Sequence, residues 1–581
     1  MLPYADKRWS RSGLMQYSKK RDPSMRKWMP IVRWLPEYQR SWLGNDLLAG
    51  ATVWAVLVPT GLAYAGLVGV EPVVGLYTIP LALIAYAIFG GSRILVVGPD
   101  AAVSVLAGAT IAAVVVGDNH LELAIALTFI VAAVYFVFYL LRLGWIADLI
   151  PDSVLKGVFE GLAWLTILKQ MPKLLGLEVD GTAETFLPRL IELFQALVGT
   201  HAMTALVGVS CILAMIALHK LAPRWPGPLI VLVVSIVIVD VQGLDDRGVA
   251  VLGDSGGGAI TLGFPGNLDF RQFLDLLPGA FAVALLGFTS GTATLKRVAE
   301  RTGERTDPDR ELLAFGIANL GAGLGGGYAV TGSMSKTEVA LMSGGKSQVG
   351  NLFTMVLSVV TILFLLPFFS TMADAALAAL VIVVMAEISD VRNFLSLWRV
   401  YRVEFFLSVI AFAGVLIYGI LGGVLIGVVL SFILLADHIR RPPTAVVGRK
   451  PSGAYVDIDD HDDAEEIPGM LIWRQYAPLS FLNARCLSEK LLGLVREREG
   501  IRVVVLDATA SAGIDTTAIS AFTSAIDDLA AARVEVWAVN VRDVAWQRIA
   551  ARSEVQGISL PLRLDSLAEA VERFEQTGNE E

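Results

Sequence analysis

Long apolar runs are the feature that most constrains this chain. Runs of about 20 residues recur from Leu47 to Ala436, and a helix of that length spans the hydrocarbon core of a bilayer. Of the 581 residues, 55% are hydrophobic and only 17% are charged, which is far from the composition of a soluble protein. After Ala436 the runs shorten and ordinary surface charge returns. The sequence therefore predicts a polytopic α-helical membrane domain followed by a soluble domain.

The apolar runs predict fourteen transmembrane segments in two sets of seven. The first set covers 47–66, 73–90, 100–116, 121–142, 153–172, 202–221 and 226–242, and the second covers 273–292, 311–325, 332–344, 349–370, 374–389, 404–418 and 420–437. Because seven is odd, the second set begins on the opposite side of the membrane, which predicts an inverted repeat. The third segment of each set is short and follows Gly or Pro, in "VGPDAAVS" (Val97–Ser104) and "VTGSMSKT" (Val330–Thr337). Matched, interrupted segments of this kind indicate a transporter site at the membrane midplane.

Charge divides the chain further. Residues 1–45 form a basic segment, which favours the cytoplasmic side of a membrane, and residues 46–440 form the transmembrane domain. Residues 441–468 contain the acidic run "DIDDHDDAEE" (Asp457–Glu466) and are predicted to be a linker. In residues 469–581, apolar strands such as "IRVVVLDATA" alternate with helical patterns, which predicts a small α/β domain. An even number of spans places this domain on the cytoplasmic side, together with the N-terminus.

Four motifs, in order along the chain, resemble the sulfate permease (SulP) family of anion transporters. Three of them, "NDLLAGATVWAVLVPTGLAYAGLVGVEPVVGLY" (Asn45–Tyr77), "FGGSRILVVGPDAAVS" and "VTGSMSKTEV", resemble signatures of the first, third and tenth spans of that family. The soluble end, with "LDATASAGIDTTAISAF", resembles a STAS domain. The resemblance implies a core domain of spans 1–4 and 8–11 that slides against a gate domain of spans 5–7 and 12–14. It also implies a homodimer in the cell membrane, and we expect no cofactor, no metal site and no nucleic-acid partner.

The two short third segments predict an anion site. If each begins at mid-membrane, its first N–H groups lack intrahelical partners and carry the positive end of the helix dipole. Two such ends facing one another attract an anion, and Lys336 adds a full positive charge. The predicted substrate-binding residues are Thr60, Tyr64, Pro99, Asp100, Ala101, Ala102, Gly332, Ser333, Met334, Ser335 and Lys336. The alternative is that Lys336 merely extends its ammonium group to a membrane interface.

The residue that couples transport to an ion gradient is less clear. Many bacterial members of the family carry a carboxylate in span 8 that serves proton or sodium coupling. Here Ser290 occupies the acidic position, and Thr294 follows one turn later on the same helix face. Asp100 is therefore the candidate coupling acid. Two other interpretations stay open: an ion pair of Asp100 with Lys336, which would leave transport uncoupled or exchanging, and an ordinary helix cap.

The predicted function is secondary active transport of small inorganic or organic anions, of the sulfate, bicarbonate, chloride or carboxylate class. Coupling to H⁺ or Na⁺, or anion exchange, would drive it, and the chain is not expected to be an enzyme. The alternatives are an anion-sensing scaffold that acts through the STAS domain and a nucleobase permease of the same architecture.

Two further motifs have a functional and a structural interpretation. "MSGGKSQ" (Met342–Gln348) nearly matches a phosphate loop, but the first Gly and the preceding strand are missing, so we expect no nucleotide site. In the soluble domain, Thr516 and Thr517 are candidates for regulatory phosphorylation at a helix start. The favoured interpretation of this turn is that Asp515 and Thr516 cap the helix.

Overall fold

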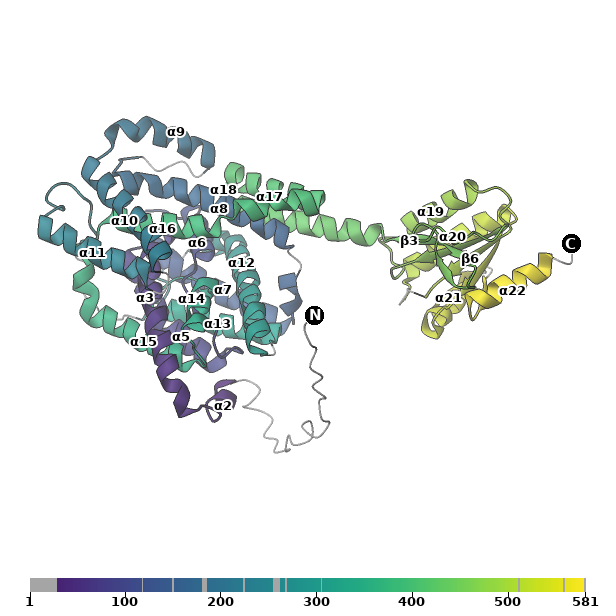
Figure 1. Ribbon diagram of the computed structural model, residues 1–581, viewed down its shortest axis with the longest axis horizontal. Coiled ribbons are helices and arrows are strands. Elements are labelled where there is room, and N and C mark those ends of the chain that lie inside the picture. Colours follow the sequence, from purple (N-terminus) through teal and green to yellow (C-terminus); the bar gives the residue numbers. More distant parts are fainter. Residues whose placement is uncertain are drawn as a thin grey trace, which may run out of the picture. The chain divides into compact units, whose positions relative to one another are not determined.

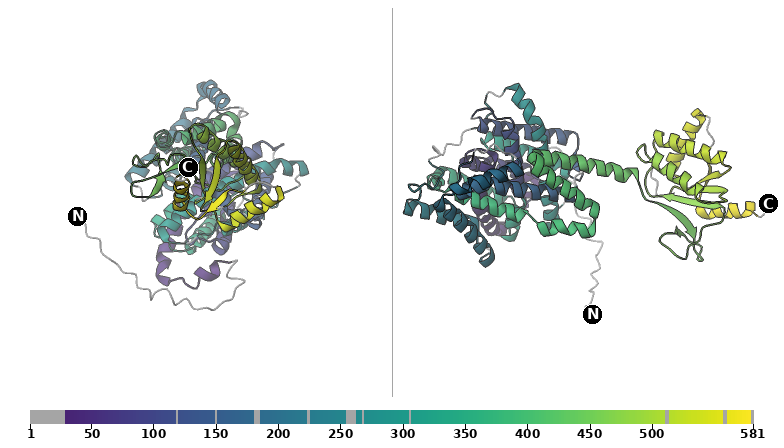
Figure 2. Two further views of the ribbon diagram at one scale, coloured as in Figure 1. Left: turned by 90° about the vertical axis from the view of Figure 1, so that its right-hand side faces the viewer. Right: turned by 90° about the horizontal axis from the view of Figure 1, so that it is seen from above.

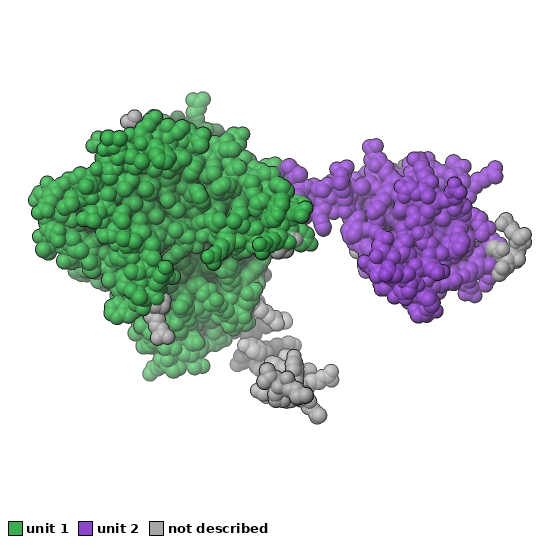
Figure 3. Space-filling model, turned by 45° about the horizontal axis from the view of Figure 1, so that its top comes forward, with its two compact units in different colours: residues 1–429 green, residues 430–581 purple. Residues whose placement is uncertain are grey.

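The computed structural model describes residues 29–117, 119–148, 151–179, 185–222, 225–253, 262–266, 269–304, 306–509, 513–556 and 560–578. The larger part of the basic segment predicted at 1–45, namely 1–28, lies outside the described residues. The chain divides into two compact units, residues 1–429 and 430–581, which Figure 3 shows in different colours.

Unit 1 is helical apart from two short strands. Within the described residues, each of the fourteen predicted spans coincides with a helix, a pair of helices or half of a long helix. These helices are α3 (Leu43–Val68), α4 (Pro72–Tyr77) with α5 (Ile79–Phe89), α6 (Ala101–Ala112), α7 (His120–Leu140), α8 (Asp152–Leu175), α10 (Ala202–Leu221), α11 (Gly227–Gln242), α12 (Phe270–Thr302), α13 (Pro308–Leu324), α14 (Met334–Met342), α15 (Val349–Val360), α16 (Asp374–Ile388) and α18 (Arg402–Arg440). Short helices α2 (Ile31–Trp34), α9 (Phe186–Ala196) and α17 (Val391–Val400) complete the unit. Seven continuous helical stretches of the described chain are long and apolar enough to cross a membrane alone.

The interruptions predicted in the apolar pattern appear as breaks in the helices. α18 contains the last two predicted spans, and Gly419 separates them with φ 75° and ψ 178°, a backbone conformation that is essentially restricted to glycine. α6 and α14 have only 12 and 9 residues, so neither crosses a membrane by itself. They begin just after the short strands β1 (Val97–Gly98) and β2 (Thr331–Gly332). The prediction of two short third segments is therefore confirmed.

The helices of unit 1 pack as two groups, whose members are labelled in Figure 1 and seen from two other sides in Figure 2. In the first group, α13 packs against α5 and α7, while α3 packs against α6, α14 and α15. In the second group, α8 and α10 pack against α16. The two groups meet where α3 contacts α11 and α16. This division follows the core and gate domains that the family resemblance implies.

Unit 2 is an α/β domain built on one six-stranded sheet, as the sequence predicts. Its strands are β3 (Thr444–Arg449), β4 (Tyr455–Asp457), β5 (Met470–Gln475), β6 (Val503–Asp507), β7 (Glu535–Val539) and β8 (Leu562–Leu564). Its helices are α19 (Ala484–Arg496), α20 (Thr516–Ala531), α21 (Asp543–Gln556) and α22 (Leu567–Gly578). The strand order is β4-β3-β5-β6-β7-β8, in which β5 to β8 run parallel and β3 is antiparallel to both of its neighbours. Figures 1 and 2 show the strands as a layer with helices packed against it.

Both faces of this sheet are covered, because successive side chains of a strand point to opposite sides. Trp473 and Val504 pack with residues of α19 and α20 on one face. Ile472 and Val505 pack with Phe574 of α22 on the other. Burial on both faces explains why β6 has an unbroken apolar sequence instead of an alternating one.

The sheet begins earlier in the chain than the sequence predicts. β3 and β4 lie within 441–468, which was predicted as an acidic linker before a domain at 469–581. Val446 of β3 pairs with Trp473 of β5, and Val447 is only 2% exposed. The apolar part of β3 is short, and its pairing partner lies beyond the acidic run. Because the strand is specified by that distant pairing, the local charge pattern concealed it.

Candidate functional site

The short strands of unit 1 bring the two interrupted segments together. β1 and β2 pair antiparallel, with Val97 opposite Gly332 and Gly98 opposite Thr331. The Ser333 N–H donates to Val96 O over 2.9 Å, and the Val96 N–H donates to Thr337 Oγ1 over 3.0 Å. α3 packs against both α6 and α14, and α12 packs against β2. The starts of α6 and α14 therefore lie side by side, between α3 and α12.

The close approach at β2 depends on glycine. A Cβ atom placed on Gly332 would lie 3.1 Å from a Leu95 methyl carbon and 3.2 Å from the Cα of Gly291 in α12. These distances are tighter than ordinary van der Waals contact. The absence of a side chain at Gly332 therefore lets β2 pack directly against α12.

Lys336 is the charged group of this site. Its side chain is only 1% exposed, although it carries an ammonium group within the membrane-spanning unit. Nζ donates to Pro99 O over 2.8 Å and to Ser333 Oγ over 3.2 Å, and it lies 5.4 Å from the centre of the Tyr64 ring. An ammonium group that extends to an interface would be exposed, so the geometry favours the site over the interfacial alternative. Burial of a lysine costs about 3 kcal/mol in a membrane helix and marks a functional position.

The start of α14 is open toward a ligand. Ser333 occupies the N-cap position, but its side chain does not accept a hydrogen bond from a backbone N–H of the helix. The first N–H groups of α14 therefore lack the usual cap and keep the positive end of the helix dipole available. Ser335, in the first turn, is exposed. This turn combines free N–H donors, a hydroxyl group and the Lys336 charge, which is the chemistry of an anion site.

The start of α6 differs from that of α14. Asp100 caps α6, because its Oδ1 accepts from the Ala102 N–H over 3.2 Å. Its charge interacts with that of Lys336, while the hydrogen bonds of the ammonium group go to Pro99 and Ser333. The expectation of two equivalent open helix ends therefore does not hold. The capping alternative is realised at Asp100, because an Asp after Pro at a helix start satisfies the N–H groups of its own first turn.

The predicted site residues on α3 and α12 use part of their hydrogen-bonding capacity within their own helices. Thr60 Oγ1 donates back to Val56 O and Leu57 O, at 2.8 and 3.2 Å. Thr294 Oγ1 donates to Ser290 O over 3.0 Å. The hydroxyl protons of these two threonines therefore stabilise their own helices. Ser290, which stands where many family members have an acid, is half-buried.

Sequence reasoning missed the role of Asp46 in α3. Its Oδ1 accepts from the Lys346 N–H over 2.6 Å and from the Ser347 N–H over 3.1 Å, and its Oδ2 accepts from Ser347 Oγ over 2.7 Å. These donors belong to the segment that nearly matches a phosphate loop. A protein carboxylate thus occupies the place that a phosphate would need, which explains the motif without a nucleotide. The Asp in the first-span signature was the available signal.

Sequence reasoning also missed Arg297 of α12. Its Nη1 lies 3.4 Å from Sδ of Met334, the first residue of α14. The signal was its spacing: Ser290, Thr294 and Arg297 follow one another at i, i+4 and i+7, which is one face of a helix.

The regulatory candidates lie in unit 2, at the start of α20. Asp515 caps this helix, because Oδ1 accepts from the Ala518 N–H over 2.8 Å and Oδ2 accepts from the Phe481 N–H over 2.7 Å. Thr516 and Thr517 are both exposed. The carboxylate of Asp515 therefore already neutralises the helix end that a phosphate would use. The structure thus agrees with the favoured capping interpretation for Asp515, and phosphorylation at these threonines stays an untested alternative.

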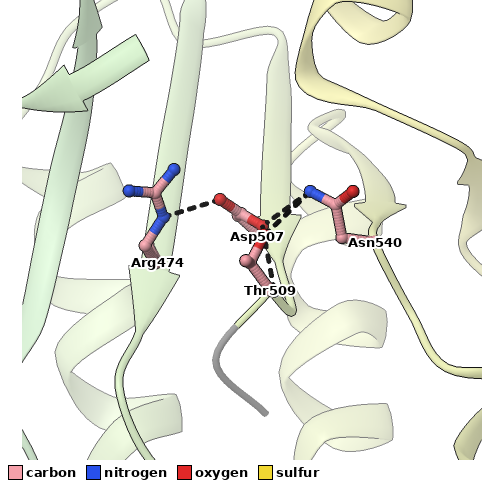
Figure 4. A network of polar contacts seen from close by, with 4 residues as sticks. All are labelled: Arg474, Asp507, Thr509 and Asn540. Atoms are coloured by element: carbon pink, nitrogen blue, oxygen red, sulfur yellow. Dashed lines mark hydrogen bonds and ion pairs between the residues drawn. The ribbon is translucent and has the colours of Figure 1, made fainter. Parts of the chain in front are cut away.

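A polar network lies near the carboxyl ends of the parallel strands in unit 2 (Figure 4). Asp507 Oδ2 accepts from Arg474 Nε over 2.7 Å, and Oδ1 accepts from the Thr509 N–H and from Asn540 Nδ2, each over 3.0 Å. Burial alone would raise the pKa of Asp507, but the hydrogen bonds from Thr509, Asn540 and Arg474 outweigh it and hold that pKa below its usual value. The network joins β5, β6 and the turn after β7.

Comparison with known proteins finds a family model and sequence relatives for both parts of the chain. The model of the sulfate permease family matches residues 43–411, and that of the STAS domain matches residues 462–562. A probable sulfate transporter of Mycobacterium tuberculosis is 33% identical over 498 residues, which is 85% of this chain and 88% of that protein. High affinity sulfate transporter 2 of Stylosanthes hamata is 27% identical over 569 residues, or 94% of this chain and 86% of that protein.

Solved structures share the fold. The murine Slc26a9 anion transporter in its inward-facing state has a TM-score of 0.86 at 20% identity, covering 99% of this chain and 100% of that one. The transmembrane domain of the cyanobacterial bicarbonate transporter BicA has a TM-score of 0.59 at 22% identity, covering 68% of this chain and 98% of that one. At these identities the likeness concerns the fold.

Proposed function

This chain belongs to the sulfate permease family and is a multi-pass membrane transporter of small anions, and we propose that sulfate is the anion that it carries. The observation that carries the proposal is the buried ammonium group of Lys336 beside the uncapped start of α14. The names of the relatives support sulfate, since both sequence relatives described above are sulfate transporters or probable ones.

The proposed site assigns a role to each part of the first turn of α14. The free N–H groups and the Ser335 hydroxyl donate hydrogen bonds to the oxygens of the anion. Lys336 supplies the charge, and the Tyr64 ring and the Pro99 carbonyl hold its ammonium group in place. Met334 and the start of α6, from Pro99 to Ala102, border the same space. The free anion must exchange part of its hydration shell for these donors, so several convergent donors are needed at the start of the helix.

We infer that transport proceeds by alternating access. The helix group that contains α3, α6, α12 and α14 holds the site, and the group around α8, α10 and α16 is its counterpart. Movement of one group against the other would expose the site first to one side of the membrane and then to the other. If the two sets of seven spans form an inverted repeat, the state open to one side of the membrane and the state open to the other would have related structures.

Three finer features belong to the same proposal. The protein would lie in the plasma membrane with both termini in the cytoplasm, which the basic residues after α18 favour. It would form a homodimer, as the resemblance implies. Its driving force would be H⁺, Na⁺ or a counter-transported anion, with Asp100 as the acid that takes up the proton in the first case.

Uptake by proteoliposomes tests the function. Purified full-length protein should carry radiolabelled sulfate into liposomes above the level of protein-free liposomes, and excess unlabelled sulfate should compete. Labelled uracil and bicarbonate serve as controls for the other substrates. Absence of sulfate uptake, with uptake of uracil or bicarbonate, would assign the chain to another substrate class. Absence of every uptake, with intact anion binding, would favour an anion-sensing scaffold.

Replacing Asp100 by Asn should abolish the pH dependence of sulfate uptake. The change removes the carboxylate that caps α6 beside Lys336, while the amide oxygen of Asn can still cap the helix. Binding should be unchanged or tighter, because a negative charge beside the anion is lost. The measurement is a profile of uptake against pH for both proteins at equal reconstituted amount. A variant profile that matches the wild type would remove Asp100 as the coupling acid.

A further inference from the structure

Arg297 is a second positive charge at the start of α14, and no part of the family signature accounts for it. It lies near the C-terminal end of α12, two helical turns after Ser290 and on the same face. Its guanidinium group contacts the side chain of Met334, with Nη1 to Sδ at 3.4 Å. Because Met334 is the first residue of α14, Arg297 lies next to the turn that contains Ser335 and Lys336.

Arg297 differs from its neighbour Arg301 in having no acidic partner among the described residues. Arg301 forms an ion pair with Glu338 of α14, at 2.6 Å. The guanidinium group of Arg297 contacts the sulfur of Met334, and its side chain is exposed. A guanidinium group is costly in hydrocarbon, so this face of α12 borders water or a ligand. An unpaired arginine beside an anion site can share its charge with the anion.

We propose that Arg297 is a specificity-determining residue that makes the site prefer a doubly charged anion to a singly charged one, an inference that rests on the anion site proposed above. Lys336 provides one positive charge, and the Asp100 carboxylate beside it offsets part of that charge. A dianion such as sulfate needs a second one, and the planar guanidinium group is suited to two oxygens of a tetrahedral oxyanion. Arg297 would reach the anion from the side of α12, while Lys336 approaches from the side of α6.

The charge of the ligand sets the size of the effect. Coulomb energy is proportional to the product of the two charges, so loss of one positive charge costs a dianion twice as much as a monoanion at the same place. Because a doubled free energy squares the ratio of binding constants, the fold loss of affinity for the dianion is the square of the fold loss for the monoanion. A loss of about tenfold for sulfate then corresponds to a loss of about threefold for a monoanion of similar shape. Methanesulfonate is such a probe, because a methyl group replaces one sulfate oxygen and one charge.

The test compares the affinities of sulfate and methanesulfonate for full-length protein in detergent, by calorimetry. For Arg297→Gln we expect a loss of about tenfold for sulfate and about threefold for methanesulfonate. Arg297→Lys keeps the charge but loses the planar pair of donors, so it should keep the preference for sulfate over methanesulfonate while binding sulfate more weakly than the wild type. Arg301→Gln is the matched control. It removes the same charge one turn further along α12, from a residue that is already paired with Glu338. It should change either affinity by less than about twofold.

Several results would overturn the inference. One is an equal loss for both anions, which indicates a steric or folding effect. Another is an unchanged sulfate affinity in Arg297→Gln, which leaves Arg297 as a residue that only stabilises the C-terminal end of α12. A loss in Arg301→Gln as large as in Arg297→Gln would indicate that the affinity depends on the total positive charge near the end of α12, and not on Arg297 in particular. If the wild type binds neither anion, the proposed function fails, which is a different outcome from failure of the role of Arg297.

Discussion

Sulfate should bind about 3 kcal/mol more weakly, or roughly 100-fold, when Lys336 is replaced by alanine. The buried ammonium group is the charged donor at the start of α14, and a hydrogen bond to a charged group contributes more than a neutral one. Its removal also leaves the Pro99 carbonyl without the donor that it has now, at 2.8 Å. Calorimetry on the purified variant measures the loss of affinity, and uptake at saturating sulfate shows whether transport is lost as well.

Two variants control for charge and for folding. Lys336→Arg keeps the charge and the ability to donate to Pro99 O, so it should retain binding. Lys346→Ala removes the same charge from the exposed turn after α14, where only the main-chain N–H of Lys346 is used, by Asp46. It should bind sulfate like the wild type. If Lys336→Ala, with an unchanged unfolding temperature, keeps the wild-type affinity, the ammonium group is structural and the site lies elsewhere.

Much of the membrane architecture followed from the apolar pattern, because a bilayer imposes its own length on every span. The break at Gly419 was visible as a single glycine between two runs, and the structure places a conformation there that favours glycine. The short α6 and α14 were visible because Gly or Pro precedes each apolar run. Local sequence specifies these features, since each depends on a run length or on one backbone conformation.

The details of the candidate site were less predictable, because they depend on contacts between segments that are distant in sequence. The sequence predicted that the segments of Asp100 and Lys336 face one another, but not that Pro99 O would accept the ammonium hydrogen bond. It also could not show that Asp100 closes one helix end while Ser333 leaves the other open. Arg297 was missed for a related reason: its helical spacing from Ser290 was visible, but a basic residue at the end of a long helix is ordinary until its neighbour is known to be Met334.

The difference between local sequence and contacts between distant segments also explains which strands of the soluble domain could be predicted. β6 and β7 are buried on both faces and were recognisable as apolar strands. β3 lies at the side of the sheet where the parallel order ends, and it is held there by β5. Its partner is separated from it by the acidic run Asp457–Glu466, whose charge dominated the local pattern. Strand formation depends on neighbours more than on intrinsic propensity, so this strand required the fold to be known.

The STAS sheet should lose about 3–5 kcal/mol of unfolding free energy when Asp507 is replaced by alanine. The carboxylate is fully buried and accepts hydrogen bonds from Arg474, Thr509 and Asn540. Its removal leaves the partly buried Arg474 without its anion, and it frees Asn540, which has a left-handed backbone with φ 57°. Hydrogen exchange at the amides of β5 to β7 in the full-length protein measures the change. Asp515→Ala, which removes a helix cap and the acceptor of the Phe481 N–H, should cost about 1–2 kcal/mol and serves as the control.

The sign of the pH dependence gives this prediction a second test. Because the folded pKa of Asp507 lies below the unfolded value, its contribution is present above about pH 4 and is lost as the pH falls through the folded pKa. Wild-type protein should therefore lose protection of these amides on acidification, and the Asp507→Ala variant should lose less over the same interval. The prediction is wrong if amide protection falls with pH at the same rate in both proteins, or if Asp507→Ala lowers the free energy of unfolding no more than Asp515→Ala does. The network would then contribute packing but no electrostatic stabilisation. The Arg474 charge would then be satisfied by solvent, since its side chain is 19% exposed.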